Sequence, residues 1–267
     1  MRLAEIHIYP VKSLRGDAHA SAEVEPRGLA GDRRWLVVDE ADRFLTQREL
    51  PHMATVAARN EPDGLALSAP DRPPIFIPIP PPDAAPRQVT IWRDTVEAVP
   101  AGPEAESWLA SVLGVPCALV FQANPASRPV NPAFAVPGDV VSFADGYPLL
   151  ITSVSSLDAL GDWLVETGDE PVPMNRFRPN AVIAGTPAWA EDDWHRVRIG
   201  AVTFRVAKPC GRCQVTTTDQ FTGERGRQPL RMLGLRRKFG QSLVFGQNVI
   251  PEAPGTIEVG DPVGIIE

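Results

Sequence analysis

Short runs in which hydrophobic and polar residues alternate recur along most of the chain. The clearest are residues 197–199 and 202–206, which are separated by Gly200-Ala201. A period of two places alternate side chains on opposite faces of a strand, and a short glycine-containing turn between two such runs predicts a hairpin. Hairpins are predicted likewise from residues 35–38 and 44–46, which flank the polar turn 39–43, and from residues 89–91 and 96–98, which pair across residues 92–95. Residues 3–8 predict a first strand, and residues 255–266 predict a strand, a turn and a strand. Many short strands joined by turns indicate a barrel or a curled sheet.

Three segments have helical periodicity instead. Residues 103–113 begin with a proline and are followed by Gly114, and two further helices are predicted at residues 155–168 and 230–238, the last of them short and basic. The proline-rich stretch 70–86 reads as an irregular edge strand. The composition changes near residues 121–137, which we take as the domain boundary. The fold class predicted is therefore mainly β with a few helices (α+β), in two parts, residues 1–120 and 121–267.

Composition narrows the classes of function. The 267 residues carry a net charge of -7, which argues against general nucleic-acid binding but allows a local basic pocket for a small anion. Three cysteines are too few for a disulfide scaffold. The N-terminus alternates like a strand rather than a signal peptide, and no stretch is apolar enough to span a membrane. We expect a cytoplasmic protein without membrane or nucleic-acid partners.

The motif Cys210-Gly-Arg-Cys213 is the sharpest local feature. Gly211 permits a tight loop, and the positive charge of Arg212 beside Cys213 would favour a metal-binding or nucleophilic thiolate. Structural zinc would need four ligands, and no second cysteine pair is present. A thioredoxin-like motif would open a helix, whereas residues 214–218 are β-branched and predict a continuing strand. Two small buried hydrophobic residues at a strand end are the simpler interpretation.

Basic residues next to proline or small polar residues form a second pattern. Lys12 and Ser13 follow the first strand, Arg33 precedes another, and Arg178 and Asn180 precede a third. Most such residues are solvated surface charges, but convergence of these would create a phosphate site. The segment 142–148, which contains Asp145-Gly146, predicts a turn.

Taken together, these residues resemble the MOSC superfamily (molybdenum cofactor sulfurase C-terminal domain), in particular its two-part members such as the mitochondrial amidoxime-reducing components and similar bacterial proteins. The resemblance implies a MOSC N-terminal β-barrel domain at 1–120 and a MOSC β-barrel domain at 121–267. Six motifs occur in the family's order: Tyr9-Pro-Val-Lys-Ser13, Gly31-Asp-Arg-Arg-Trp35, Phe177-Arg-Pro-Asn180, Cys210-Gly-Arg-Cys213 with Thr216-Thr-Thr-Asp219, Phe245-Gly-Gln-Asn248 and Gly255-Thr-Ile-Glu-Val-Gly-Asp-Pro262.

The resemblance implies a molybdenum cofactor, a pyranopterin (molybdopterin) whose dithiolene holds the metal. It makes Cys213 the protein thiolate on molybdenum, leaves Cys210 without that role, and places Asp145 near the metal as a second catalytic residue. Cofactor contacts are implied for Lys12, Ser13, Arg33, Gly146, Tyr147, Arg178, Asn180, Gly211, Arg212 and Asn248. Relatives carry small hydroxyl residues at the positions of Gly146 and Tyr147 and a tyrosine at that of Asn248, so only backbone contacts are expected from the first two.

The implied activity is a molybdenum-dependent oxidoreductase that reduces small N-oxygenated (N-hydroxylated) compounds. Electrons would come from a separate ferredoxin-, flavin- or cytochrome-type donor protein, because no cysteine-rich iron–sulfur segment follows the MOSC part. Two alternatives stay open: a sulfur carrier that holds a persulfide on Cys213 for cofactor maturation, and a non-catalytic small-molecule binding protein or dithiol redox protein. Pyridoxal phosphate binding is sometimes attributed to this domain, but the sequence has no lysine in a setting that suits a Schiff base.

Overall fold

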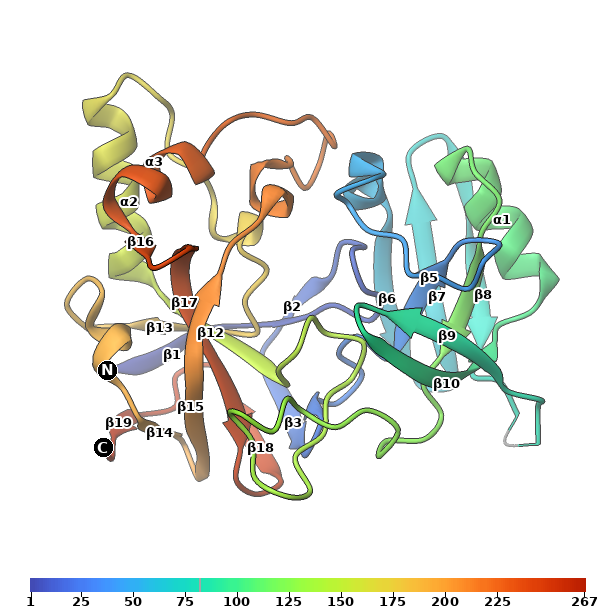
Figure 1. Cartoon of the computed structure of the whole chain (residues 1–267), viewed down its shortest axis with the longest axis horizontal. Helices are drawn as coiled ribbons and strands as arrows, with labels where there is room; N and C mark the ends of the chain where they lie inside the picture. The colour runs from blue at the N-terminus through green and yellow to red at the C-terminus, as the bar shows by residue number, and fades with distance from the viewer. Residues whose placement is uncertain (82) are drawn as a thin grey trace.

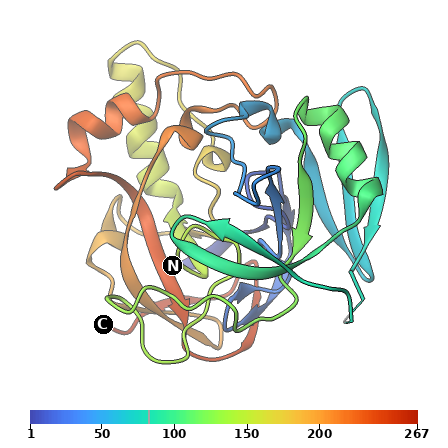
Figure 2. The same cartoon turned by 45° about the vertical axis from the view of Figure 1, so that its right-hand side comes forward.

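The computed structural model describes residues 1–81 and 83–267. Within these residues the fold is built mainly from short strands, with three α-helices at its periphery (Figure 1). Strands β5 to β11 and helix α1 lie on one side, and β12 to β17 with α2 and α3 lie on the other (Figures 1 and 2). The expected fold class, mainly β with a few helices, is confirmed.

The largest sheet combines both ends of the chain. Its strand order is β19 (Val263–Ile265), β14 (Arg196–Ile199), β15 (Val202–Gly211), β17 (Ser242–Pro251), β12 (Leu149–Ser153), β13 (Ala181–Ala184), β1 (Arg2–Ile8) and β2 (Asp17–His19), and β16 (Lys238–Phe239) pairs with β17. The predicted hairpin is confirmed as β14–β15, with Val197 opposite Phe204. Leu3, Ile6 and Ile8 of β1 are buried in the same apolar cluster as Phe204, and the register of β1 shifts between Leu3 and Glu5. Burial of this face holds the sheet together.

Three smaller sheets complete the fold. One has the order β5 (Trp35–Val38), β11 (Ala118–Phe121), β10 (Asp94–Pro100), β9 (Arg87–Ile91); another has β6 (Ala57–Glu61), β7 (Gly64–Ala69), β8 (Arg72–Pro78); the third has β18 (Gly255–Glu258), β3 (Ser21–Glu25), β4 (Gly28–Leu29). The predicted β9–β10 pairing is confirmed by Val96 opposite Val89. The proline-rich stretch supplies β8 at a sheet edge, as expected; residue 82 of that stretch lies outside the described residues.

The first strands of the chain pair with strands of the C-terminal half. β1 runs antiparallel to β13, with Leu3 opposite Ile183, and β3 pairs with β18, with Val24 opposite Gly255. The two halves are therefore joined by backbone hydrogen bonds as well as by the connecting chain. The boundary near residue 120 stays a prediction.

The three helices lie close to their predicted positions: α1 (Pro103–Leu113), α2 (Val154–Glu166) and α3 (Leu230–Arg236). At the start of α2 the Ser153 hydroxyl accepts a hydrogen bond from the backbone N–H of Ser156 at 3.1 Å, which caps the helix. No helix in the described part of the chain is both long and apolar enough to cross a membrane.

The prediction that residues 214–218 continue as a strand was wrong. Gln214–Thr217 form a 3₁₀ turn, η4, with Cys213 at its N-cap position. The Thr216 hydroxyl donates to the carbonyl oxygen of Cys213 at 2.9 Å, and the Thr217 hydroxyl donates to that of Gln214 at 2.8 Å. These local bonds favour a turn despite the β-branched side chains.

Candidate functional site

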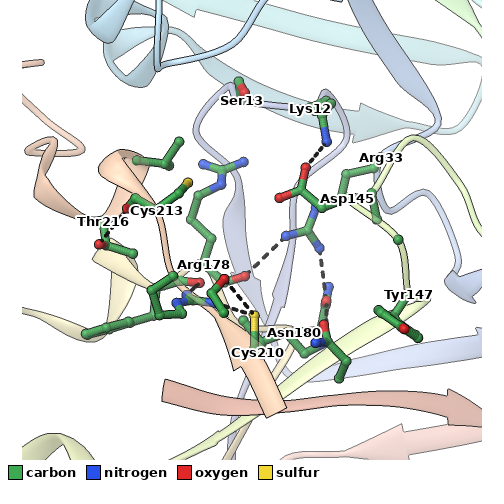
Figure 3. A pocket seen from close by; sticks show the side chains of 18 of the residues that line it. Lys12, Ser13, Arg33, Asp145, Tyr147, Arg178, Asn180, Cys210, Cys213 and Thr216 are labelled. Atoms are coloured by element: carbon green, nitrogen blue, oxygen red, sulfur yellow. Dashed lines mark hydrogen bonds and ion pairs between the residues drawn. The ribbon is translucent and has the colours of Figure 1, made fainter. Parts of the chain in front are cut away.

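One pocket of about 820 Å³, counting the space open to solvent, contains every site residue predicted from the sequence (Figure 3). They lie at the ends of β1, β5, β12, β13 and β15 or in the adjoining loops, except for Asn248, which lies within β17. The lining includes Lys12, Ser13, Arg33, Asp145, Gly146, Tyr147, Arg178, Asn180, Gly211, Arg212, Cys213 and Asn248. The structure thus brings together residues from positions 12 to 248, although it does not test the role of any of them.

Arg33 is held rigidly at the base of the pocket. Its Nη1 donates to Asp32 Oδ2 at 2.6 Å and to Asn180 Oδ1 at 2.9 Å, and its Nη2 donates to the carbonyl oxygen of Arg178 at 3.2 Å. Asp32 is completely buried and also accepts the backbone N–H of Tyr9 at 2.9 Å. A buried carboxylate that pairs with a guanidinium in this way fixes the direction of the positive charge.

Asn180 orients Arg33 and joins two strands. Besides accepting from Arg33, its Oδ1 accepts the backbone N–H of Leu150 at 3.2 Å, and its Nδ2 donates to the carbonyl oxygen of His7 at 3.2 Å. Because both polar atoms are engaged within the protein and the residue is buried, we infer that Asn180 acts as a positioning residue for Arg33.

Arg178 presents a donor group that the protein leaves unused. Its guanidinium and that of Arg33 each lie over the ring of Tyr9, at 4.3 and 4.4 Å from the ring centre. Nη1 donates to Gln220 Oε1 at 3.3 Å, whereas the buried Nη2 has no hydrogen-bond partner among residues 1–81 and 83–267. Burial lowers the pKa of Arg178 to about 10, so the side chain remains charged at neutral pH. An unpaired buried cationic donor is costly unless a ligand accepts from it.

Three of the cationic or polar pocket residues have left-handed backbone conformations. The φ angles are 67° at Ser13, 48° at Arg33 and 54° at Arg178. Residues other than glycine adopt this region at a cost of about 1–3 kcal/mol each, and such residues cluster at functional sites. All three residues line the same pocket.

Lys12 and Asp145 form an ion pair across the pocket. Lys12 Nζ lies 2.5 Å from Asp145 Oδ1. Burial of Lys12 lowers its pKa to about 8, although Asp145 acts in the opposite direction. Partial desolvation raises the pKa of Asp145, but Lys12 and the nearby charges of Arg48 and Arg33 outweigh it and hold that pKa well below its usual range. The carboxylate is therefore ionised at any physiological pH.

The loop that carries Asp145 is fixed from behind by Arg128. This buried side chain donates to the carbonyl oxygens of Ser142, Ala144 and Asp145 and pairs with Asp94 at 2.7 Å. The predicted turn at 142–148 is thus a rigid part of the pocket wall.

The lowered pKa of Lys12 predicts how anion binding depends on pH. Lys12 is charged below pH 8 and loses its proton as the pH rises through that value. Because a buried ammonium attracts anions only while it is protonated, we expect sulfate, whose own charge is constant in this range, to bind about tenfold more weakly at pH 9 than at pH 7. Isothermal titration of the protein with sulfate measures this, and Lys12→Met should bind weakly at both pH values. Equal pH dependence in Lys12→Met would contradict the prediction.

The two cysteines of the motif have different surroundings. Cys213 lies at the N-cap of η4, and Cys210 lies at the end of β15; the two sulfur atoms are well separated in Figure 3. Arg212 Nη1 donates to Cys210 Sγ at 2.8 Å, and its Nη2 donates to the carbonyl oxygen of Phe177. The expected effect of the Arg212 charge on the Cys213 thiol stays a prediction. The Cys213 thiol is left half-buried at the pocket wall.

Asn248, a predicted pocket residue, donates weakly to the carbonyl oxygens of Lys208 and Pro209 at 3.4 Å.

Four polar residues of the pocket lining were not predicted from the sequence: Thr46, Arg48, Arg176 and Thr216. Arg48 lies over the ring of Trp92 at 4.5 Å. Its position just after the predicted strand 44–46 repeats the pattern seen at Lys12, and this pattern could have identified it.

The pocket therefore suits a ligand that has an anionic group at one end and a soft metal ion at the other. Lys12, Arg33 and Arg178 supply the positive charge, and Cys213 supplies a thiol of the type that soft metals prefer. The unpaired Nη2 of Arg178 and the left-handed conformations of Ser13, Arg33 and Arg178 fit a bound phosphate-bearing group. These residues fit the molybdenum–pterin cofactor that the sequence resemblance implies.

The comparison with known families defines the class of protein. Residues 1–116 match the MOSC N-terminal beta barrel domain, and residues 138–264 match the MOSC domain. The chain belongs to the MOSC-domain family and has both of its parts.

Within that class, the whole chain is similar to the amidoxime-reducing components. Mitochondrial amidoxime-reducing component 1 of Mus musculus is 33% identical over 282 residues, which cover 99% of this chain and 82% of that protein. Mitochondrial amidoxime reducing component 2 of Bos taurus is 30% identical over 279 residues, or 98% and 82% of the two chains. The molybdenum cofactor sulfurase of Anopheles gambiae is 31% identical over 265 residues, which cover 92% of this chain and 34% of that protein.

Proposed function

We propose that this protein is a molybdenum-dependent oxidoreductase that reduces N-hydroxylated small molecules with electrons from a separate donor protein. The balanced reaction converts R–NHOH, two electrons and two protons into R–NH₂ and water. The amidoxime-reducing relatives support the reaction class by their name. The observation that carries the proposal is that one pocket joins the Cys213 thiol to the cationic groups of Lys12, Arg33 and Arg178.

In this proposal the protein's residues hold and orient the cofactor. Arg178 and Arg33 would bind its anionic end, and Cys213 would be the protein ligand to the metal. When bound, the cofactor would supply the two-electron redox chemistry that reduction of the N–OH group needs. Asp145 keeps a carboxylate beside the pocket, where its pairing with Lys12 holds both side chains in place.

A direct experiment combines composition and turnover. The protein is produced in a host that synthesises molybdenum cofactor, and its molybdenum and pterin contents are measured. The rate at which it reduces benzamidoxime is measured in a separate assay, with dithionite-reduced methyl viologen as the electron donor. We expect about one molybdenum and one pterin per chain and reduction to benzamidine. Protein that contains the pterin and metal but does not reduce any N-hydroxylated compound would refute the reductase, and protein that contains neither would refute the cofactor.

A sulfur-carrier function is the second candidate, favoured by the similarity to a molybdenum cofactor sulfurase. It requires a persulfide on Cys213, which an intact-mass measurement detects as a gain of one sulfur after incubation with a cysteine desulfurase and cysteine. Transfer of that sulfur to an acceptor, without reductase activity, would favour the carrier.

A cytoplasmic location is part of our proposal and is tested by cell fractionation.

A further inference from the structure

Residues 221–240, which we call the basic segment, have a charge opposite to that of the whole chain. The segment holds six of the 26 basic residues and one of the 33 acidic residues, whereas the chain has a net charge of -7. Its basic residues are Arg225, Arg227, Arg231, Arg236, Arg237 and Lys238. A cluster of one sign on a protein of the opposite sign produces a local field that attracts complementary partners.

Three of these six basic side chains are paired or hydrogen-bonded within the described residues, and three are not. Arg236 pairs with Glu166 at 2.8 Å, Arg237 pairs with Asp192 at 2.7 Å, and Arg225 donates to backbone carbonyl oxygens of the N-terminal half. The others are exposed and form no ion pair within residues 1–81 and 83–267: Arg227, Arg231 and Lys238. Their charges are available to a partner.

Large apolar side chains are exposed among these charges. The exposed fraction is 63% for Phe221, 70% for Leu235 and 49% for Phe239. Protein-interaction surfaces combine apolar side chains with a polar rim, and these three residues would supply the apolar part of such a surface.

The basic segment lies next to the end of the pocket that contains Cys213. It begins four residues after η4, whose N-cap is Cys213, and α3 packs against η4. Arg225 donates to the carbonyl oxygens of Gln47 and Arg48, next to the pocket residues Thr46 and Arg48. The loop before α3 runs along the upper edge of the molecule between α3 and the N-terminal half (Figures 1 and 2). A protein bound there would be close to the thiol side of the pocket.

We propose that the basic segment is the docking surface for a small acidic one-electron carrier protein. The inference rests on the proposed function, which requires two electrons from outside for each N–OH group reduced. Two reduced carriers would bind in succession, and each would be oxidised by one electron. Charge complementarity selects an acidic partner, steers its approach and is weakened by salt.

The test separates docking from chemistry with two electron sources. The variant R227E/R231E/K238E is compared with R2E/R72E/R198E, which changes the net charge equally at exposed residues outside the segment. The probes are an acidic plant-type [2Fe–2S] ferredoxin and dithionite-reduced methyl viologen. For the variant in the basic segment we expect the KM for reduced ferredoxin to rise at least tenfold at low ionic strength, with the viologen rate within twofold of the parent. The control variant should match the parent in both assays.

Binding to protein without cofactor gives an independent readout. Titration with oxidised ferredoxin should show a dissociation constant that rises steeply with salt, and R227E/R231E/K238E should weaken binding at least tenfold. Equal ferredoxin binding by the two variants would overturn the docking surface, as would binding of the parent to anionic lipid vesicles but not to ferredoxin. If the parent protein does not reduce N-hydroxylated compounds with methyl viologen as donor, the proposed function is refuted. The ferredoxin titration would still show whether the basic segment is a docking surface.

Discussion

Replacing Cys213 by alanine is expected to remove most of the bound molybdenum and to lower the rate of benzamidoxime reduction at least about a hundredfold. Loss of an outer-shell partner of a metal ligand already costs about 10–100-fold in affinity or activity, so loss of the proposed ligand itself should cost at least as much. The side chain is half-buried at the N-cap of a short turn, and its removal should leave the fold intact. Metal analysis and turnover of protein from a cofactor-producing host measure the effect.

Cys210→Ala is the matched control. Its sulfur accepts a hydrogen bond from Arg212 at 2.8 Å, so we expect it to orient Arg212 rather than to bind metal. The variant should retain at least half of the molybdenum. Equal loss of metal and activity in both variants would point to a dithiol mechanism and against a single ligand.

Asp32→Asn is expected to destabilise the protein by about 3–5 kcal/mol. Asp32 is completely buried and pairs with Arg33, whose side chain is also largely buried. Removal of one partner of a buried ion pair leaves the other charge without compensation, which costs this amount. The free energy of unfolding from urea titration measures the change. Sulfate binding should weaken as well, since Arg33 loses its orientation.

Asp39→Asn supplies the comparison for a solvated pair. Asp39 pairs with Arg43 at 2.9 Å, but the Arg43 side chain is mostly exposed. Exposed pairs contribute about 0–1 kcal/mol, so this variant should lose less than about 1 kcal/mol. A similar small loss for Asp32→Asn would show that the Arg33 network does not stabilise the fold.

The elements that could be predicted from sequence are those set by local patterns. The hairpins at β9–β10 and β14–β15 and the helix α1 have the expected positions because periodicity and turn residues specify them. The pairing of β1 with β13 depends on burial of Leu3 and Ile6 against residues almost two hundred positions away, and no local pattern encodes such a partner. The turn after Cys213 was mistaken for a strand since hydroxyl-to-backbone bonds outweighed the β propensity of threonine.

Short sequence motifs were enough to predict which residues line the candidate site. They were not enough to predict which neighbour each side chain contacts. Lys12, Arg33 and Arg178 were identified from short motifs, and they do line one pocket. Arg212 is adjacent to Cys213 in sequence, yet its guanidinium contacts Cys210. Neighbours along an irregular loop can point in different directions, and only the backbone path settles which thiol a guanidinium reaches.

The pairing of β1 with β13, and of β3 with β18, has a consequence for biosynthesis. β1 cannot pair with β13 until residue 184 has left the ribosome, and β3 cannot pair with β18 until residue 258 has done so. The pocket is lined by residues from Lys12 to Asn248, so its full lining exists only after residue 248 has been synthesised. Insertion of a prosthetic group into the complete pocket therefore follows translation of nearly all of these residues.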